Sequence, residues 1–463
     1  MGKPAPEKMV ALPQSGSSRV YYRFFFDDGT SLLGSHNPDI KENIAHYVFT
    51  GHFVKKGLPV PKILAKDEQN KYFILQDAGN NTLFDLLMRD GLSREVKGYY
   101  FQTMEDVVRF QTEGINGLDL SVAFPAPEFN AESIHWDLNY FKYYFVKTNA
   151  IVFDEQLLED DFNAFAQKLL NAESSFFMFR DFQARNIMVN DGKLTYIDFQ
   201  GGRKGPLQYD VVSLLYQAKA NLPQSFKDEL LEHYLTRLEA VLPGRKESFL
   251  TDFPYFIYFR LMQVLGAYGF RGIYQRKAHF LQSIPLAIES LKNLLALHPL
   301  TGFDELNAVF KQIIALNDYN YKPLVKNKLN ITLSSFSYKK SGPPVDITEN
   351  GGGFVFDCRA LPNPGRMPEL RDFTGLQEPV INYLKNQTEM TRFLENVFSI
   401  VDQSVENYLE RNFNHLMVSF GCTGGKHRST FSAENLFRHL KEKYGDKLDV
   451  RLKHIQLEKD NLI

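Results

Sequence analysis

The sequence predicts an α+β fold made of a small β-rich lobe and a larger helical lobe, followed by a separate small α/β domain. Residues 19–33 alternate like a β-hairpin, residues 82–175 and 222–297 carry apolar side chains at helical spacing, and the chain beyond residue 328 has the order strand, glycine-rich turn and helix. We therefore predict three parts: the small lobe at 1–80, the helical lobe at 81–320 and the last domain at 328–463.

The composition is that of a soluble globular chain and argues against several classes of function. Of the 463 residues, 44% are hydrophobic and 23% are charged, and the formal net charge is -2, so no bulk attraction to nucleic acid or anionic membranes is expected. No run approaches the roughly 18 apolar residues of a membrane span, and the first residues lack an apolar signal segment. Because Cys358 and Cys422 are the only cysteines, we predict a cytoplasmic protein without a disulfide framework or a membrane partner.

The most informative stretch is a predicted strand and hairpin at residues 176–198. An apolar strand at 176–179 precedes Arg180, Asp181 and Asn186, which have the order R-D-x-x-x-x-N, and the following hairpin ends at Asp198. Mg²⁺ prefers hard oxygen ligands such as the Asn186 amide and the Asp198 carboxylate. A second carboxylate, Asp181, would orient an acceptor hydroxyl and take its proton. The ordered set indicates phosphoryl transfer.

Three segments carry a family resemblance: FRDFQARNIM, YIDFQGG and GPLQYDVVSLL. They resemble the aminoglycoside phosphotransferase and choline kinase superfamily, and most closely the cell-wall sugar kinases that phosphorylate N-acetylmuramate and N-acetylglucosamine at the anomeric hydroxyl. The resemblance implies a protein-kinase-like fold, ATP and Mg²⁺ as cofactors, and a small hydroxyl acceptor. It implies Asp181 as catalytic base, Asn186 and Asp198 as metal ligands, and Arg180 and Asp210 as structural support. Phe179 occupies the position where the family usually has histidine.

The nucleotide site is predicted from the small lobe. The loop before the first hairpin would cover the phosphates, and the strand end near residue 77 would meet the adenine edge by resemblance, so the expected cofactor-binding residues are Ser15, Ser17, Ser18, Arg19, Gln76 and Ala78. The returning strand has Leu32-Leu33-Gly34 where protein kinases have a phosphate-binding lysine. Arg19 or Arg23 would supply that charge; otherwise the domain is a pseudokinase.

The helical lobe contains two further features with alternative interpretations. The aromatic segment at 133–145 is interpreted as core, with a sugar-stacking wall that includes Asp137 as the alternative. Arg260 is interpreted as a solvated surface charge, with a phosphate contact as the alternative.

The last domain contains a predicted anion site. An apolar strand at 416–420 runs into the turn GCTGGKHRS and a helix, so backbone N–H groups of the turn and helix start converge, with Lys426, His427 and Arg428 adding charge. One interpretation is a cysteine-phosphatase loop, C-x-x-G-x-x-R-S, with Cys422 as nucleophile, although Gly421 stands where histidine commonly precedes that cysteine.

The other interpretation is a second resemblance. The motifs FVFDCRALPNP, LRDFTGLQEPV and GCTGGKHRS resemble, over roughly residues 330–460, the C-terminal domain of the RNase adapter protein RapZ, a sensor for glucosamine-6-phosphate. The resemblance implies a sugar-phosphate pocket built from Asp357, Arg359, Asn363, Thr423, Gly424, Lys426, His427 and Arg428. Gly365 stands where this family has histidine. RNA is a partner by resemblance alone, since the mild basic excess after Gly421 favours an ordinary solvated surface.

These expectations combine into one leading function: an ATP-dependent phosphotransferase, acting on an amino sugar of cell-wall recycling, joined to a hexosamine-phosphate sensor. Three alternatives stay open: a non-catalytic adapter built from a nucleotide-sensing pseudokinase and a ligand- or RNA-binding sensor, a choline or aminoglycoside kinase, and a bifunctional kinase and phosphatase that uses Cys422. A homo-oligomer is compatible with each of them.

Overall fold

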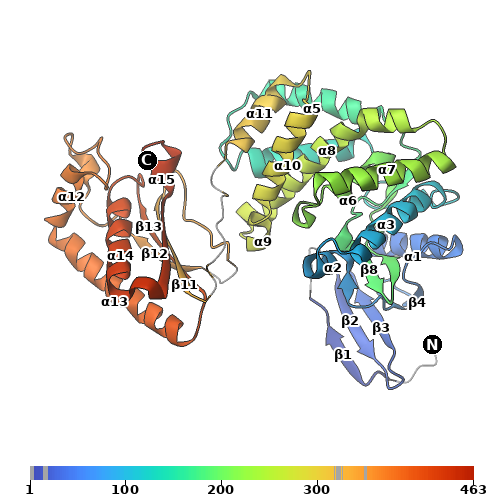
Figure 1. Ribbon diagram of the computed structural model, residues 1–463, viewed down its shortest axis with the longest axis horizontal. Coiled ribbons are helices and arrows are strands. Elements are labelled where there is room, and N and C mark those ends of the chain that lie inside the picture. Colours follow the sequence, from blue (N-terminus) through green and yellow to red (C-terminus); the bar gives the residue numbers. More distant parts are fainter. Residues whose placement is uncertain (1–4, 14–18, 317–318, 320–324, 326, 349–351) are drawn as a thin grey trace. The chain divides into compact units, whose positions relative to one another are not determined.

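The computed structural model describes residues 5–13, 19–316, 319, 325, 327–348 and 352–463 (Figure 1). By its internal contacts the chain divides into two compact units. The first comprises Met1–Phe270 and Ser283–Asn317, and the second comprises Arg271–Gln282 and Asp318–Ile463.

The first unit begins with an antiparallel sheet whose strands lie in the order β1-β2-β3-β5-β4. These strands are β1 (Lys8–Ala11), β2 (Val20–Phe25), β3 (Ser31–His36), β4 (Ile63–Lys66) and β5 (Tyr72–Gln76). Helix α1 (Ile40–Lys55) follows the predicted hairpin β2–β3. Asp39 caps its first turn by accepting a 3.1 Å hydrogen bond from Glu42 N, as the sequence predicts.

The larger lobe of the first unit is helical, as its apolar spacing predicts (Figure 1). Its helices are α2 (Leu83–Asp90), α3 (Arg94–Thr112), α4 (Ala131–Phe141), α5 (Glu155–Leu170), α6 (Leu207–Leu215), α7 (Gln224–Val241), α8 (Lys246–Tyr268), α10 (Ile284–Leu297) and α11 (Asp304–Ile314). Helices α4 and α8 approach closely at Gly266, where a Cβ atom would lie 2.8 Å from Phe141 N. This contact explains why a residue without a side chain stands in α8 at that point.

Short strands carry the predicted catalytic segment. Strand β7 (Phe176–Met178) pairs antiparallel with β10 (Arg203–Gly205), and β8 (Ile187–Asn190) lies between β6 (Asn81–Thr82) and β9 (Lys193–Tyr196). The hairpin β8–β9 has the predicted turn, in which Asp191 and Gly192 adopt positive φ values of 48° and 74°. The strand, turn and strand predicted from the sequence are confirmed.

The second unit contains a parallel sheet in the order β12-β13-β11-β14. The strands are β11 (Leu329–Ser337), β12 (Gly353–Asp357), β13 (His415–Cys422) and β14 (Leu448–His454); the helices are α9 (Ala278–Leu281), α12 (Glu378–Lys385), α13 (Thr388–Glu410), α14 (Arg428–Tyr444) and α15 (Ile455–Lys459). Residues 349–351, which precede β12, lie outside the described residues.

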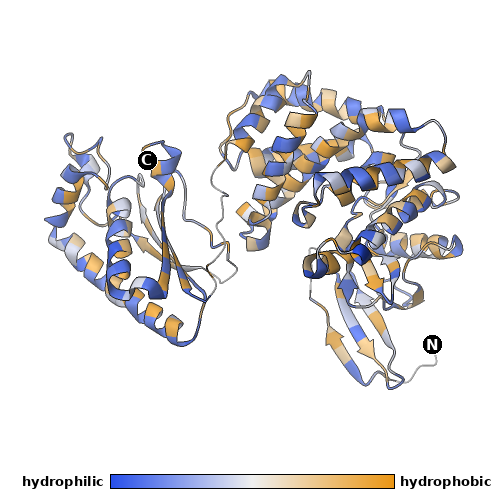
Figure 2. Cartoon of the chain, viewed as in Figure 1, coloured by the Kyte–Doolittle hydropathy of each residue, from blue (hydrophilic) through white to orange (hydrophobic). Residues whose placement is uncertain are grey.

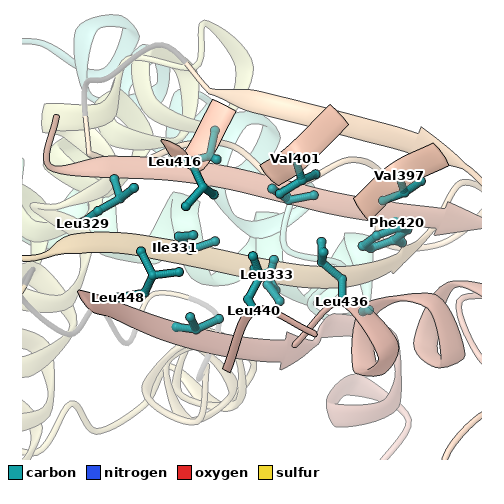
Figure 3. Packing of buried hydrophobic residues seen from close by; sticks show 14 of the residues in the cluster. Leu329, Ile331, Leu333, Val397, Val401, Leu416, Phe420, Leu436, Leu440 and Leu448 are labelled. Carbon is teal, nitrogen blue, oxygen red and sulfur yellow. The ribbon is translucent and has the colours of Figure 1, made fainter. Parts of the chain in front are cut away.

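The core of this sheet lies between the strands and helices α13 and α14 (Figure 3). Val397, Val401 and Val405 recur at four-residue spacing and form one buried face of α13, while other faces of both helices are hydrophilic (Figure 2). Such spacing places apolar side chains on a single stripe of a helix. Of the helices in the described ranges, none is long and apolar enough to cross a bilayer.

Candidate active site and ligand loop

Asp210 holds the segment that carries the predicted catalytic residues. Its carboxylate, on the first turn of α6, accepts hydrogen bonds from Phe179 N at 2.7 Å and Arg180 N at 3.0 Å. Burial raises the pKa of Asp210 to about 7, and the two backbone donors oppose that rise. The Phe179 ring packs edge-on against Phe110, with centroids 4.8 Å apart. The loop is therefore held through backbone donors and aromatic packing.

Asp181, Asn186 and Asp198 lie together at the end of this segment. Asn186 Nδ2 donates to the Asp181 carbonyl oxygen at 2.9 Å and to Asp198 Oδ2 at 3.1 Å. Asp198 and Arg180 both adopt positive φ values, 66° and 78°, which residues other than glycine rarely adopt. Strained backbone of this kind is typical of functional sites.

The oxygen atoms at this point fit a divalent cation. Asn186 offers an amide oxygen and Asp198 a carboxylate, the hard ligands that Mg²⁺ takes together with substrate phosphates. Burial, followed by the nearby Asp181 charge, raises the pKa of Asp198. A cation would offset the repulsion between these two carboxylates, so Asn186 and Asp198 would hold Mg²⁺ and neutralise charge on bound phosphates.

A chain of polar contacts connects Asp198 to α1. Gln200 Nε2 donates to Asp198 Oδ1 at 2.9 Å and to Glu42 Oε1 at 3.1 Å. Glu42 Oε1 in turn lies 3.2 Å from Arg19 Nη2, and the Arg19 side chain is buried. Arg19 thus brings a positive charge toward the Asp198 carboxylate.

A cavity of about 260 Å³ lies between the small sheet and the catalytic hairpin. Its polar lining includes Arg19, Asn186 and Asp198, and its apolar walls come from both lobes, with Leu33, Pro61, Leu75, Met188 and Ile197 among them. Gln76 and Ala78 also line it. The structure therefore brings Arg19, Gln76 and Ala78 together at one cavity, whereas Ser15, Ser17 and Ser18 lie outside the described residues.

The β3 residue that lines the cavity, where protein kinases have a lysine, is Leu33. Its neighbour Gly34 lies on the other face of the strand, beside Tyr22 and Phe24. Arg23, in β2, also lines the cavity, but it is held by the segment after β5, with Nε 2.7 Å from Asp77 Oδ2 and Nη2 donating to the Gly79 carbonyl at 2.8 Å. Arg19 is the one of the two whose charge acts on Asp198.

The structure corrects the interpretation of Arg260 and agrees with only part of the interpretation of the aromatic segment 133–145. Arg260 is only 5% exposed, so its interpretation as a solvated charge is wrong: α8, which carries it, packs against α4 and α6. The aromatic segment is divided, because Phe141 and Phe145 are buried while Trp136 is exposed. The sequence contained no signal for the burial of Arg260 beyond the apolar residues around it.

The predicted ligand loop of the second unit follows β13 at the carboxyl end of the parallel sheet. Gly425 has φ +66°, and a Cβ atom there would lie 2.7 Å from Gln456 Cβ. Lys426 Nζ donates to the Asp372 carbonyl at 2.9 Å, and Gly375 N donates to the Lys426 carbonyl at 2.9 Å. The motifs around residues 372 and 425 therefore meet, although about fifty residues separate them.

Other predicted pocket residues lie at the same edge with different roles. Arg428 is 4% exposed and donates through Nη1 to the Arg359 and Leu361 carbonyls at 2.8 and 2.9 Å. Arg359 is exposed and forms a 2.7 Å ion pair with Asp357. Arg428 thus ties the motif at 357–363 to the loop, and Arg359 faces solvent.

The remaining predicted pocket residues lie close to the loop. Asn363 Oδ1 accepts a hydrogen bond from Gly365 N at 3.2 Å, and a Cβ atom at Gly365 would lie 3.3 Å from His427 Cε1. His427 Nε2 is buried without a hydrogen-bond partner among the described residues. Thr423 is partly buried and Gly424 exposed, so the open part of the loop is at its start.

Cys422 is buried at the end of β13. It is 2% exposed, and its Sγ lies 3.1 Å from Ser429 Oγ. A nucleophilic thiolate needs an accessible sulfur atom, so this packing does not favour the phosphatase interpretation.

Comparison with known proteins agrees with this division of the chain. Residues 122–247 match the phosphotransferase enzyme family, and residues 329–458 match the RapZ C-terminal domain. A segment of the first unit is therefore similar to kinase-type phosphotransferases, and the unit has a kinase-like fold. The second unit contains a segment similar to the RapZ C-terminal domain.

Individual relatives match only parts of the chain. A nucleotide-binding protein of Glaesserella parasuis is 42% identical over 134 residues, covering 29% of this chain and 44% of the relative; one from Clostridium beijerinckii is 38% identical over 127 residues, covering 27% and 41%. The chain thus spans less than half the length of either relative.

Solved structures similar to the chain are kinases of low sequence identity. An amicoumacin kinase complex with AMP-PNP and Ca²⁺ covers 65% of this chain and 92% of its own, at 15% identity and a TM-score of 0.45. An ethanolamine kinase of Plasmodium vivax covers 66% and 81%, at 12% identity and a TM-score of 0.42.

Proposed function

We propose that the first unit is an ATP- and Mg²⁺-dependent phosphotransferase whose acceptor is an amino sugar of cell-wall recycling. The observation that carries this proposal is the contact of Asn186 with Asp198, 3.1 Å apart, on the loop that also presents Asp181. In the reaction, the acceptor oxygen forms a bond to the γ-phosphorus while the bond to the β–γ bridging oxygen breaks. Asp181 takes the hydroxyl proton, and Asn186 and Asp198 hold the cation that neutralises charge on the phosphates.

The nucleotide would occupy the cavity beside these residues. Its apolar walls suit an adenine ring, and Gln76 and Ala78 lie where backbone groups can meet the adenine edge. Arg19 would contact the phosphates, since its guanidinium is paired with Glu42 on the cavity side of α1. This arrangement supports a working phosphate site despite the absent lysine.

The test is ATP consumption with magnesium across a panel of acceptors: N-acetylmuramate, N-acetylglucosamine, glucosamine, choline and an aminoglycoside. We expect turnover with an amino sugar, and a loss of roughly 10²- to 10⁴-fold in the Asp181→Asn variant, because the base is removed while the fold is kept. Asp191→Asn, in the exposed hairpin turn, is the matched control and should retain turnover. Equal rates for Asp181→Asn and wild type would rule out this assignment.

We further propose that the second unit binds a hexosamine phosphate at the loop 423–428. Three loops that converge there, with the Lys426 charge and the exposed Gly424 backbone, support an anionic ligand. Titration calorimetry with glucosamine 6-phosphate should give binding that Lys426→Ala weakens, whereas Lys441→Ala, farther along α14, should leave the affinity unchanged. Equal binding by glucosamine would argue against a phosphate-specific site.

The second candidate function is a non-catalytic adapter, favoured by the absence of the strand lysine. Protein that binds ATP with magnesium but consumes none with any acceptor in the panel would support it. RNA binding, a homo-oligomer and a cytoplasmic location stay predictions under either function.

A further inference from the structure

A second cluster of polar side chains lies beside Asp181. Gln263 Oε1 accepts hydrogen bonds from Tyr209 Oη at 3.1 Å and from Arg260 Nη1, and Gln263 Nε2 donates to Asp137 Oδ2 at 2.8 Å. Arg260 Nη2 also lies 3.9 Å from Asp181 Oδ1. Because both ends of the Gln263 amide are engaged, α4, α6 and α8 hold one connected network against the catalytic loop.

This network has an open side and a buried side. The Asp181 side chain is 45% exposed, whereas the Arg260 side chain is 6% exposed. Asp137 is partly buried, and Arg260 Nε has no hydrogen-bond partner among the described residues. A molecule that reaches Asp181 therefore meets two carboxylates that accept hydrogen bonds, with the positive charge of a buried guanidinium behind them.

The carboxylates of the network already have counter-charges. Burial raises the pKa of Asp137, and Arg180 and Arg260 oppose that rise. A third arginine, Arg203, is also buried, and its pKa is lowered to about 10 by burial and by Arg180. An ammonium group entering here would lose its hydration and approach three guanidiniums, while a hydroxyl group would donate to a carboxylate and carry no charge.

We infer that Asp137 and Arg260 form an acceptor subsite for a polyhydroxylated molecule without a positive charge, such as an N-acetylated amino sugar, and that Arg260 excludes acceptors that carry a free cationic amine. This inference rests on the proposed function, and it goes beyond it by assigning the discrimination to named side chains. It separates an uncharged or acidic sugar acceptor from choline and from aminoglycosides, which all carry cationic groups. Arg260 acts here as a specificity-determining residue, and the reacting proton still goes to Asp181.

The test compares N-acetylglucosamine with glucosamine, which share a ring and differ at the nitrogen on C2: a neutral acetamide in one and a protonatable amine in the other. At pH 6.5, below the roughly 7.7–8.0 pKa of an α-amino group, the glucosamine amine should be mostly protonated. We expect wild-type kcat/KM for N-acetylglucosamine to exceed that for glucosamine by roughly tenfold or more, from charge repulsion at close range. Arg260→Gln should narrow this ratio, and Asp137→Asn should widen it, because the two changes alter the local charge in opposite directions.

If the two variants shift the kcat/KM ratio in opposite directions, the residues have a specificity role. A general loss of packing would instead lower kcat/KM for both sugars together and leave the ratio unchanged. Arg237→Gln, at the exposed end of an ion pair on α7, is the matched control and should leave the ratio unchanged. Equal use of both sugars by wild type, or a ratio that both variants leave unchanged, would overturn the inference while the phosphotransferase assignment stands. If Arg260→Gln fails to fold, the Asp137→Asn ratio decides alone. No transfer to any acceptor would overturn the proposed function and this inference with it.

Discussion

Arg19 Nη2 lies 3.2 Å from Glu42 Oε1, so an arginine that precedes β2 pairs with a glutamate of α1. In protein kinases, the lysine of the corresponding ion pair lies on the third strand. This chain has Leu32-Leu33-Gly34 at that point and therefore no lysine. The charge reaches the cavity from Arg19, the residue just before the neighbouring strand β2. On β3, Leu33 occupies the cavity-facing position where a lysine would lie.

We predict that Arg19→Ala weakens ATP binding by roughly tenfold or more, since a charged hydrogen bond contributes about 1.5–3 kcal/mol. Calorimetric titration with a non-hydrolysable ATP analogue measures the loss. Arg109→Ala, on the exposed side of α3, is the control for removing an arginine paired with acids. If Arg19→Ala binds the analogue with unchanged affinity, another group of the protein binds the phosphates.

We predict that Asp210→Ala destabilises the first unit by about 3 kcal/mol, because the backbone N–H groups of Phe179 and Arg180 would lose their acceptor. Urea denaturation measures the change. Asp228→Ala, an exposed aspartate of α7, should change stability by less than about 0.5 kcal/mol. Similar losses in both variants would mean that Asp210 does not hold the catalytic segment.

His46 predicts a dependence of stability on pH. It is 6% exposed, and burial, then Arg19, lowers its pKa from 6.5 to about 3. Between these values the unfolded chain binds a proton that the folded chain does not, so this histidine's contribution to stability falls as the pH falls below 6.5. From pH 7 to 5 we expect a loss of about 2 kcal/mol in wild type that His46→Gln lacks. Parallel stability curves for the two proteins would contradict this assignment.

We predict that substitutions of two neighbouring glycines in the loop 423–428 affect stability differently. Gly425→Ala should destabilise the second unit by about 3 kcal/mol, because φ is +66° and the new Cβ would lie 2.7 Å from Gln456 Cβ and 2.8 Å from Ser337 N. Gly424→Ala should fold normally, since nothing lies within 4 Å of its Cβ position. Hydrogen exchange of β11 and β13 amides follows the stability of this unit. Equal protection in both variants would refute the prediction.

Much of the candidate site could be predicted from the sequence because its residues are close together in the chain. Asp181, Asn186 and Asp198 occupy one strand-turn-strand segment, and local hydrogen bonding and turn chemistry already place them near each other. The loop 421–429 is similar, since it directly joins β13 to α14. The spacing of these residues along the chain was therefore enough to predict that they lie close together.

Contacts between distant segments had to come from the tertiary structure. Arg19 and Arg23 both line the cavity, and their different partners, Glu42 and Asp77, lie in distant segments. Whether Arg260 is solvated depends on the packing of α8. Identical arginines have identical local preferences, so no pattern separates a buried one from an exposed one. The sequence by itself determined which chemistry the chain carries, through ordered short-range motifs. Only the tertiary structure decided which charges meet, because burial and pairing depend on elements that are far apart in the chain.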